Sequence, residues 1–326
     1  MEALSILTIL GLVIGSGFVS GREIVTFFTR FGFWSIPCSF LSFFVFLFLF
    51  KFILNLGEKG LKSVKNSRFF TILNIFLSII FSSAMFSGVS NLISFDNKIL
   101  SFFLLSVVLV LCFLIYKNGL GTLNRLNLFL VPVMILFLMI GFFCIIKFPL
   151  PSFDAATFNS QSLLYLIFYC ILNTTSGSVV IMALGEKLSK RQKTRVALIA
   201  SLVLSVLLFG ANLILLLNPS SFSADMPLLA LFSGNLKIVM NGIVLLGALT
   251  SLFSLIFSSS KLLRGLCVDE SLVFFISVIL PLIVSLLGFK LIVSYIYPAA
   301  SVLGFLILCE LYFRKNSQKF KILSKL

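Results

Sequence analysis

The sequence predicts an all-α membrane protein with ten transmembrane helices. Of its 326 residues, 60% are hydrophobic and only 11% are charged, whereas a water-soluble domain carries roughly 25% charged residues. Apolar stretches near the length of about 20 residues that a membrane-spanning helix needs recur along the chain. Basic residues are concentrated in every second connection between these stretches. A multi-pass membrane protein accounts for all three observations.

Ten apolar stretches cover most of the chain. The predicted spans are 3–28, 33–56, 69–94, 99–116, 123–146, 161–185, 194–217, 236–260, 271–288 and 290–313. The connections are short, so we expect a single transmembrane domain over residues 1–326 and no soluble domain. The longest connections are 147–160 and 218–235, and the second is expected to hold a short re-entrant or interfacial helix.

The basic residues predict the orientation in the membrane. Ten spans place both termini on one side, and the connections and tail on that side hold most of the 25 Lys and Arg residues. Because Lys and Arg are enriched in cytoplasmic loops, we expect a protein of the plasma membrane with both termini in the cytoplasm. The net charge of +15 is then an orientation signal at an anionic membrane surface, and we expect no nucleic-acid binding.

The residue types present argue against an enzyme. The chain has no histidine, which excludes imidazole metal ligands, Ser–His nucleophile pairs and histidine proton relays. The six cysteines are scattered singly through apolar segments, which is typical of small core residues. The aspartates fall in predicted loops, so no membrane aspartate pair is expected. We therefore predict no catalytic residues and no cofactor.

Two of the predicted spans are interrupted near their middle by small and polar residues. The first carries IGSGFVSG at 14–21, and the sixth carries YCILNTTSGSVV at 169–180. Each opens a set of five spans, so we expect an inverted repeat of residues 1–147 and 160–313, followed by a basic tail, 314–326. Paired interruptions in an inverted repeat indicate a transporter binding site, because freed backbone groups bind ligands there. The alternative is that the small residues only allow close helix packing.

Two motifs carry a family resemblance. The stretch GLVIGSGFVSGREIVTFFTRFG resembles the first-helix signature of the YkvI-type membrane proteins, in which an IGAGFASG-E-FF-FG pattern recurs. More distantly, IGSG and FYCILN resemble the first and sixth helices of the amino acid–polyamine–organocation superfamily, whose fold is that of LeuT. The resemblance implies that spans 1, 2, 6 and 7 rock against spans 3, 4, 8 and 9. It also implies that a small solute, often an amino acid, binds at the midplane.

The resemblance implies that the solute contacts both interrupted helices. The first offers backbone N–H groups to a carboxylate, and the sixth offers polar side chains and an aromatic wall. The predicted substrate-binding residues are Ser16, Gly17, Phe18, Ser20, Gly21, Tyr169, Asn173, Thr174, Thr175 and Ser176. Ser83, Met85 and Phe86 in the third span are expected to wall the pocket.

Relatives that use sodium hold one ion between the first and eighth helices. In this chain, the implied ligands are the carbonyls of Gly11, Ile14 and Gly247 and the hydroxyls of Thr250 and Ser251. Five hard oxygens suit Na⁺. The alternative is that these hydroxyls bond a carbonyl of their own helix.

Arg22 and Glu23 follow the first interruption directly. Neighbouring residues on a helix point about 100° apart, so the two do not face each other. Charges inside a membrane are costly and are functional candidates. We expect Glu23 to carry a coupling proton, to pair with a cationic substrate group or to form part of an outer gate. The alternative is a helix cap, with both side chains reaching toward the outer water.

These features together predict a secondary active transporter. Its expected cargo is a small amino-acid-like solute, coupled to Na⁺ or H⁺ by alternating access. The expected partners are this solute and the lipid bilayer; the sequence indicates no protein partner. The alternative is a ligand-sensing membrane subunit of the same fold that does not transport, as in the germinant receptors of spores.

Overall fold

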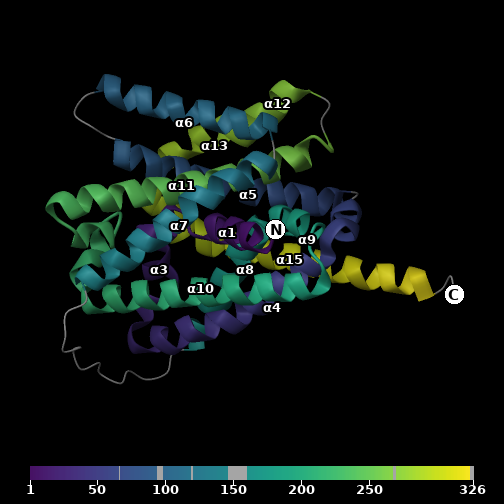
Figure 1. The fold of residues 1–326 in the computed structure, drawn as a ribbon, viewed down its shortest axis with the longest axis horizontal. Helices are drawn as coiled ribbons and strands as arrows, with labels where there is room; N and C mark the ends of the chain where they lie inside the picture. Colours follow the sequence, from purple (N-terminus) through teal and green to yellow (C-terminus); the bar gives the residue numbers. More distant parts are fainter. Residues whose placement is uncertain (66, 94–97, 119, 146–159, 267–268, 324–326) are drawn as a thin grey trace.

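The structure, a computed structural model, describes residues 1–65, 67–93, 98–118, 120–145, 160–266 and 269–323. This part of the chain is almost entirely helical, and most helices run along the long axis of the molecule (Figure 1). Residues 147–159 of the predicted connection 147–160, and the last residues of the predicted basic tail, 324–326, lie outside it.

Among these residues, seven helices are long and apolar enough to cross a membrane, or eight if one bent pair counts as a single span. Each of the ten predicted ranges contains helix. The length and composition of the described helices do not establish ten crossings, however, so that number stays a prediction.

The N-terminal half begins with a chain of short helices and continues with long ones. Its elements are α1 (Glu2–Val13), α2 (Ser16–Val19), α3 (Arg22–Phe27), η1 (Thr29–Trp34), α4 (Ser35–Lys65), α5 (Arg68–Ile93), α6 (Lys98–Asn118) and α7 (Leu120–Ile145).

The C-terminal half begins with a bent pair of helices. The elements up to the end of its third long helix are α8 (Ser160–Ser176), α9 (Ser178–Gly185), α10 (Lys190–Leu217), η2 (Pro219–Ser223), η3 (Leu229–Leu231) and α11 (Gly234–Leu263). The remaining elements are α12 (Glu270–Phe274), η4 (Phe275–Ile279), α13 (Leu280–Val284), η5 (Ser285–Leu287), α14 (Phe289–Leu291), η6 (Ile292–Ile296) and α15 (Tyr297–Leu323). The short helix expected within 218–235 is present as two 3₁₀ turns, η2 and η3.

Two π-helical turns, η4 and η6, interrupt the last helical segments. Each is followed two residues later by a proline, Pro281 or Pro298. Proline has no N–H to donate, and its ring clashes with the carbonyl four residues earlier. In both cases this carbonyl lies within the π turn, whose wider backbone moves it away from the ring. The sequence therefore explains why the helix widens at these two places.

The helices pack in two groups. In the first group, α4 packs against α8, α9 and α10, and α1 packs against α10. In the second, α11 packs against α5, α6 and α12, and α13 packs against α5. Figure 1 shows the second group on the upper side of the molecule and α4 and α10 on the lower side, with α1 between them. These contacts follow the grouping of spans that the family resemblance implies, and α1 packs in addition against α7 and against α11 of the second group.

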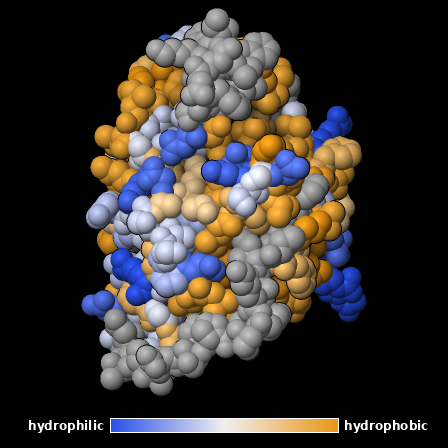
Figure 2. All heavy atoms as spheres, turned by 90° about the vertical axis from the view of Figure 1, so that its left-hand side faces the viewer, coloured by the Kyte–Doolittle hydropathy of each residue, from blue (hydrophilic) through white to orange (hydrophobic). Residues whose placement is uncertain are grey.

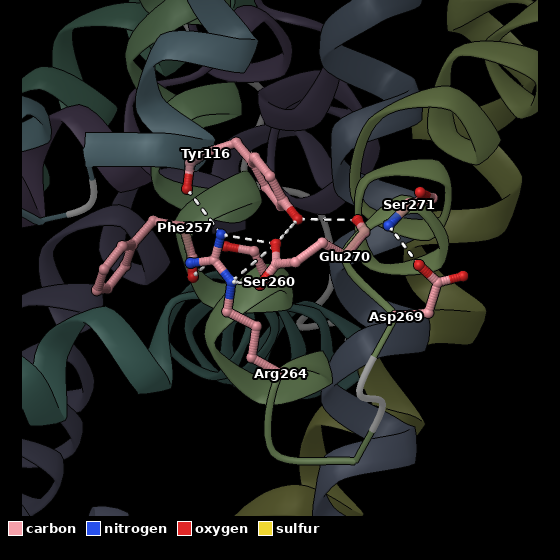
Figure 3. A network of polar contacts seen from close by, with 7 residues as sticks. All are labelled: Tyr116, Phe257, Ser260, Arg264, Asp269, Glu270 and Ser271. Atoms are coloured by element: carbon pink, nitrogen blue, oxygen red, sulfur yellow. Dashed lines mark hydrogen bonds and ion pairs between the residues drawn. The ribbon is translucent and has the colours of Figure 1, made fainter.

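A polar network joins three helices of the second group (Figure 3). Glu270 at the start of α12 accepts hydrogen bonds from the Tyr116 hydroxyl of α6 and from Arg264, whose Nε lies 3.0 Å from Glu270 Oε1. The Arg264 guanidinium also lies 4.5 Å from the Tyr116 ring centroid. The hydrogen bonds to Glu270 raise the pKa of Arg264, which keeps it charged.

Apolar and polar side chains are distributed as in a membrane protein. Large apolar side chains are exposed on the helices, including Phe48 on α4 and Phe143 on α7. Many serine, threonine and asparagine side chains are buried between helices instead. Figure 2 looks onto the end of the molecule at the left of Figure 1, where hydrophilic residues gather between apolar flanks.

Candidate functional site

The first predicted interruption is present as two breaks in the backbone. Helix α1 ends at Val13, and Gly15 is extended with φ −90° and ψ −173°. Between α2 and α3, Gly21 has φ +80°, a left-handed conformation that residues with a side chain rarely adopt. Two glycines therefore stand where the chain leaves the helical path.

The second predicted interruption lies against the first. Helices α8 and α9 are bent by 63° at the single residue between them, Gly177. A Cβ atom built on Gly177 would lie 2.7 Å from Leu12 Cγ of α1. On the other side of α8, a Cβ atom on Gly304 of α15 would lie 2.7 Å from Thr175 Oγ1. The absence of side chains at both glycines thus brings α1, α8 and α15 together.

The predicted polar side chains of the sixth span bond to their own helix. Asn173 Nδ2 donates to Tyr169 O at 3.1 Å, and Thr174 Oγ1 donates to Cys170 O at 2.6 Å. Thr175 and Ser176 also donate to carbonyls within α8. These residues are buried at the bend, but the three hydroxyl protons and one amide N–H of Asn173 are already used in this structure.

The backbone of the first interruption is partly used as well. Gly21 N–H donates to Phe18 O at 3.0 Å, and Ser20 Oγ donates to Gly17 O at 3.1 Å. The expectation that Gly21 offers an available N–H therefore does not hold in this conformation. Among the described residues, the N–H groups of Gly17 and Phe18 have no hydrogen-bond partner.

Helix α5 closes the first interruption from the side of the second group. Met85 Sδ accepts from Ser16 N at 3.4 Å and from Ser16 Oγ at 3.3 Å. A Cβ atom on Gly88 would lie 2.8 Å from Ser16 Cβ. Met85 therefore lies where a wall residue is expected, whereas Ser83 bonds to the carbonyls of its own helix.

The five predicted sodium ligands lie together between α1 and α11. Ser251 Oγ donates to Gly11 O at 2.8 Å, and a Cβ atom on Gly247 would lie 3.0 Å from Ile14 O. Thr250 Oγ1 lies 3.1 Å from Gly247 O, within its own helix. These contacts bring Ser251 to Gly11 and Gly247 to Ile14, and Thr250 is in the alternative, back-bonded arrangement.

Asn127 of α7 lies beside this cluster and is absent from the predicted set. Its side chain is fully buried, and neither its amide oxygen nor its amide nitrogen has a partner in the described part of the chain. A Cβ atom on Gly11 would lie 3.2 Å from Asn127 Cγ. A polar amide within an apolar span was the only sequence signal that pointed to it.

Arg22 joins the first interruption to a connection from the other half. Its Nε donates to Ser294 Oγ at 2.8 Å, and its Nη1 donates to Phe222 O at 2.7 Å and to Ala224 O at 3.2 Å. Arg22 thus bridges the π turn η6 and the connection that contains η2 and η3.

This connection, residues 219–232, covers one end of the first interruption and is called the lid segment below. Leu228 N–H donates to Ser20 O at 2.8 Å. A Cβ atom on Gly21 would lie 2.7 Å from Leu228 Cγ, so any larger residue at position 21 would push the lid segment away. A cavity of about 540 Å³ lies beside the lid segment. It is lined by Asn91, Leu92, Ala224, Asp225, Met226, Leu229, Ala230, Lys237 and Asn241.

Glu23 points into the protein. Its side chain is 1% exposed, and a Cβ atom on Gly17 would lie 2.7 Å from Glu23 Cγ. Asn173 lies beside the carboxylate, and Tyr169 and Tyr297 interact with it electrostatically. The alternative in which both side chains reach outer water is therefore wrong: Glu23 is buried, and Arg22, 6% exposed, bonds to Ser294, Phe222 and Ala224. The Glu23 side chain points inward because Gly17 has no side chain, which leaves space for the carboxylate between α2 and α8.

Comparison with known proteins identifies relatives of this chain. No family model matches it. It is 25% identical over 308 residues to the uncharacterized membrane protein YkvI of Bacillus subtilis, and the match covers 88% of each chain. The predicted resemblance to the YkvI-type membrane proteins is thus confirmed.

Two solved structures with a similar fold are those of transporters. One is Mhp1, a nucleobase-cation-symport-1 family transporter, in a closed conformation with bromovinylhydantoin bound (TM-score 0.54, 12% identity, 94% of this chain and 74% of that chain). Another is the manganese transporter of Eremococcus coleocola in complex with an aromatic bis-isothiourea compound (TM-score 0.52, 13% identity, 94% of this chain and 76% of that chain). At these identities, the likeness concerns the fold alone, and it confirms the expected LeuT-like transporter fold.

Proposed function

We propose that this relative of YkvI is a secondary active transporter of a small amino-acid-like solute, driven by a gradient of Na⁺ or H⁺. The observation that carries the proposal is the contact between the two interrupted helices at Gly177 and Leu12. An interrupted helix is tolerated in a membrane only where it is buried in protein or lines a cavity, and paired interruptions of this kind mark the binding site in transporters built from inverted repeats. The fold, shared with solved transporters, supports the same conclusion.

The proposed solute site lies between the interruptions. The unpaired N–H groups of Gly17 and Phe18 suit a carboxylate, and Tyr169 supplies an aromatic wall. The proposed sodium site uses oxygens of Gly11 and Ser251 together with those of Ile14, Gly247 and Thr250. In this proposal, Na⁺ replaces the hydrogen bond between Ser251 Oγ and Gly11 O: the hydroxyl keeps its proton and rotates, so that both oxygens face the ion.

The proposed topology has ten spans in an inverted five-plus-five repeat, with both termini in the cytoplasm. The lid segment then faces the outside and covers the solute site from there, because it bonds to Ser20 and Arg22. Alternating access requires the lid segment to leave these residues when the first helix group rocks against the second. Release on the inner side follows from the opposite rotation.

Uptake into liposomes by the purified protein, under separately imposed Na⁺ and H⁺ gradients, tests this proposal. We expect at least one amino acid or related solute to accumulate under one gradient. Thr250→Ala is expected to reduce uptake that Na⁺ drives, because it removes one proposed ligand. The matched control is Ser259→Ala, which removes another buried, back-bonded hydroxyl of α11 away from the proposed site.

The outcomes separate transport from sensing. Solute binding without accumulation under either gradient would contradict transport and favour a ligand-sensing membrane subunit of the same fold. Uptake that an H⁺ gradient drives and that Thr250→Ala leaves unchanged would remove Na⁺ from the mechanism and keep transport.

A further inference from the structure

Three buried oxygen atoms around Glu23 lack a partner. Glu23 Oε2 on α3, Tyr169 Oη on α8 and Tyr297 Oη at the start of α15 form no hydrogen bond within the described residues. Helix α3, which carries Glu23, packs against α8, which carries Tyr169, and against η6, which directly precedes Tyr297, so the three residues belong to elements that meet at one place. We call these three residues the acidic cluster.

Among the described residues, no ion pair brings a positive charge to this cluster. Arg22, the neighbour of Glu23 in sequence, directs its guanidinium to Ser294 and to the lid segment. Of the ion pairs formed by the described residues, none includes Glu23. A buried carboxylate without a cation is strongly unfavourable, so a ligand is expected to bring the missing charge or proton.

Aromatic rings enclose the cluster. The Tyr297 ring stacks on Phe81 at 4.4 Å between centroids, and the Tyr169 ring packs edge-on against Phe28 at 5.1 Å. The interactions fix the phenol positions, and aromatic faces attract organic cations. Tyr297 directly follows the π turn η6, a type of turn that is frequent at functional sites.

We propose that Glu23, Tyr169 and Tyr297 bind a protonated amine of the transported solute, which makes an amine-bearing solute the substrate class. A primary ammonium group has three N–H donors. They match the three unpaired oxygens, one of which carries the compensating charge. A proton alone neutralises Glu23 but satisfies at most one phenol. This inference rests on the proposed function, and it adds Tyr297 to the site.

Binding to the purified full-length protein tests the inference without transport. The probes are alanine with lactate, 4-aminobutyrate with 4-hydroxybutyrate, and phenylalanine with phenyllactate. Each pair exchanges an ammonium group for a hydroxyl group. We expect at least one amine to raise the melting temperature of the wild type and to bind at least about tenfold tighter than its hydroxy partner.

Substitutions in the acidic cluster test whether the preference for an amine over its hydroxy partner depends on these residues. Glu23→Gln is expected to weaken amine binding about tenfold or more, and Tyr297→Phe several-fold. Glu310→Gln is the matched control, because this carboxylate bonds to Ser67 and Arg314 away from the cluster. Glu23→Asp keeps the charge and is expected to retain part of the preference. This retention separates charge recognition from a folding defect in Glu23→Gln.

Three outcomes would overturn the inference: no amine binds the wild type, a hydroxy partner binds as tightly as its amine, or amine binding survives Glu23→Gln. Na⁺ binding that Glu23→Gln abolishes, with no amine preference, would also overturn it and assign the cluster to a metal ion. Failure of the proposed function looks different. In that case an amine binds and its binding depends on Glu23, which supports the amine site. Liposomes that contain the protein nevertheless show no uptake, which contradicts transport.

Discussion

Arg22→Gln is expected to shift the protein toward a conformation in which the lid segment is open. In the closed structure, the Arg22 side chain is 6% exposed and forms two short hydrogen bonds, to Phe222 O at 2.7 Å and to Ser294 Oγ at 2.8 Å. A hydrogen bond to a charged group contributes about 1.5–3 kcal/mol. Because arginine regains water in the open state and the two bonds are not additive, we take about 3 kcal/mol for both. This value corresponds to about a 150-fold change in the ratio of closed to open molecules.

Labelling of a cysteine beneath the lid segment measures this ratio. Ser16→Cys, introduced after the six native cysteines are replaced, places a thiol at a position that is fully buried in the closed structure. A membrane-impermeant maleimide reacts with it only when the site opens toward the reagent. We expect Arg22→Gln to accelerate the labelling strongly, because opening is the step that limits access.

Lys290→Gln provides the matched control for this experiment. Lys290 Nζ also bonds to the lid segment, at 2.9 Å from Ser223 O, but its side chain is exposed. Exposed charged groups contribute little because water replaces their contacts. Labelling that is equally fast in Lys290→Gln, or unchanged in Arg22→Gln, would refute the reasoning that the buried guanidinium holds the lid segment closed.

Three further substitutions have distinct expected effects. Gly177→Ala forces a methyl group against Leu12 and should lower the free energy of unfolding by about 1–3 kcal/mol; an unchanged midpoint of chemical denaturation would argue against tight contact between the interruptions. Ser251→Ala leaves Gly11 O without its hydrogen-bond donor and should lower the free energy of unfolding by about 1–3 kcal/mol. If Na⁺ binds there, stabilisation by Na⁺ should also disappear, and its persistence would place the ion elsewhere. Glu270→Gln removes an exposed ion pair, so scanning fluorimetry should show a slightly lower melting temperature in low salt and an unchanged melting temperature in high salt. A large decrease in the melting temperature would contradict the description of this ion pair as exposed and weak.

The local pattern of the sequence was sufficient to find both interruptions. Gly15, Gly21 and Gly177 lie where the backbone leaves the helical path, and glycine is the residue that tolerates these conformations. Each predicted helical range contains helix for the same local reason, since long apolar stretches have few other structures in a membrane.

Contacts between distant parts of the chain were not predictable in this way. Tyr297 lies 274 positions after Glu23, and nothing in its neighbourhood marks it as a partner of that carboxylate. The direction of Glu23 also depends on Gly17 of the preceding helix, whose missing side chain admits it. Asn127 illustrates the same limit, because only the packing of α7 on α1 places its amide beside Gly11.

The lid segment is recognised through its main chain, and this has a consequence for how the protein tolerates mutation. Phe222 and Ala224 contribute carbonyl groups to Arg22, and these hydrogen bonds do not depend on the chemical type of their side chains. Leu228 contributes both an N–H group to Ser20 and a side chain that packs on Gly21. Most substitutions at Ala224 should therefore be silent, whereas the Phe222 side chain also packs against the core. Proline at position 228 is different, because it alone among the amino acids has no N–H to donate to Ser20.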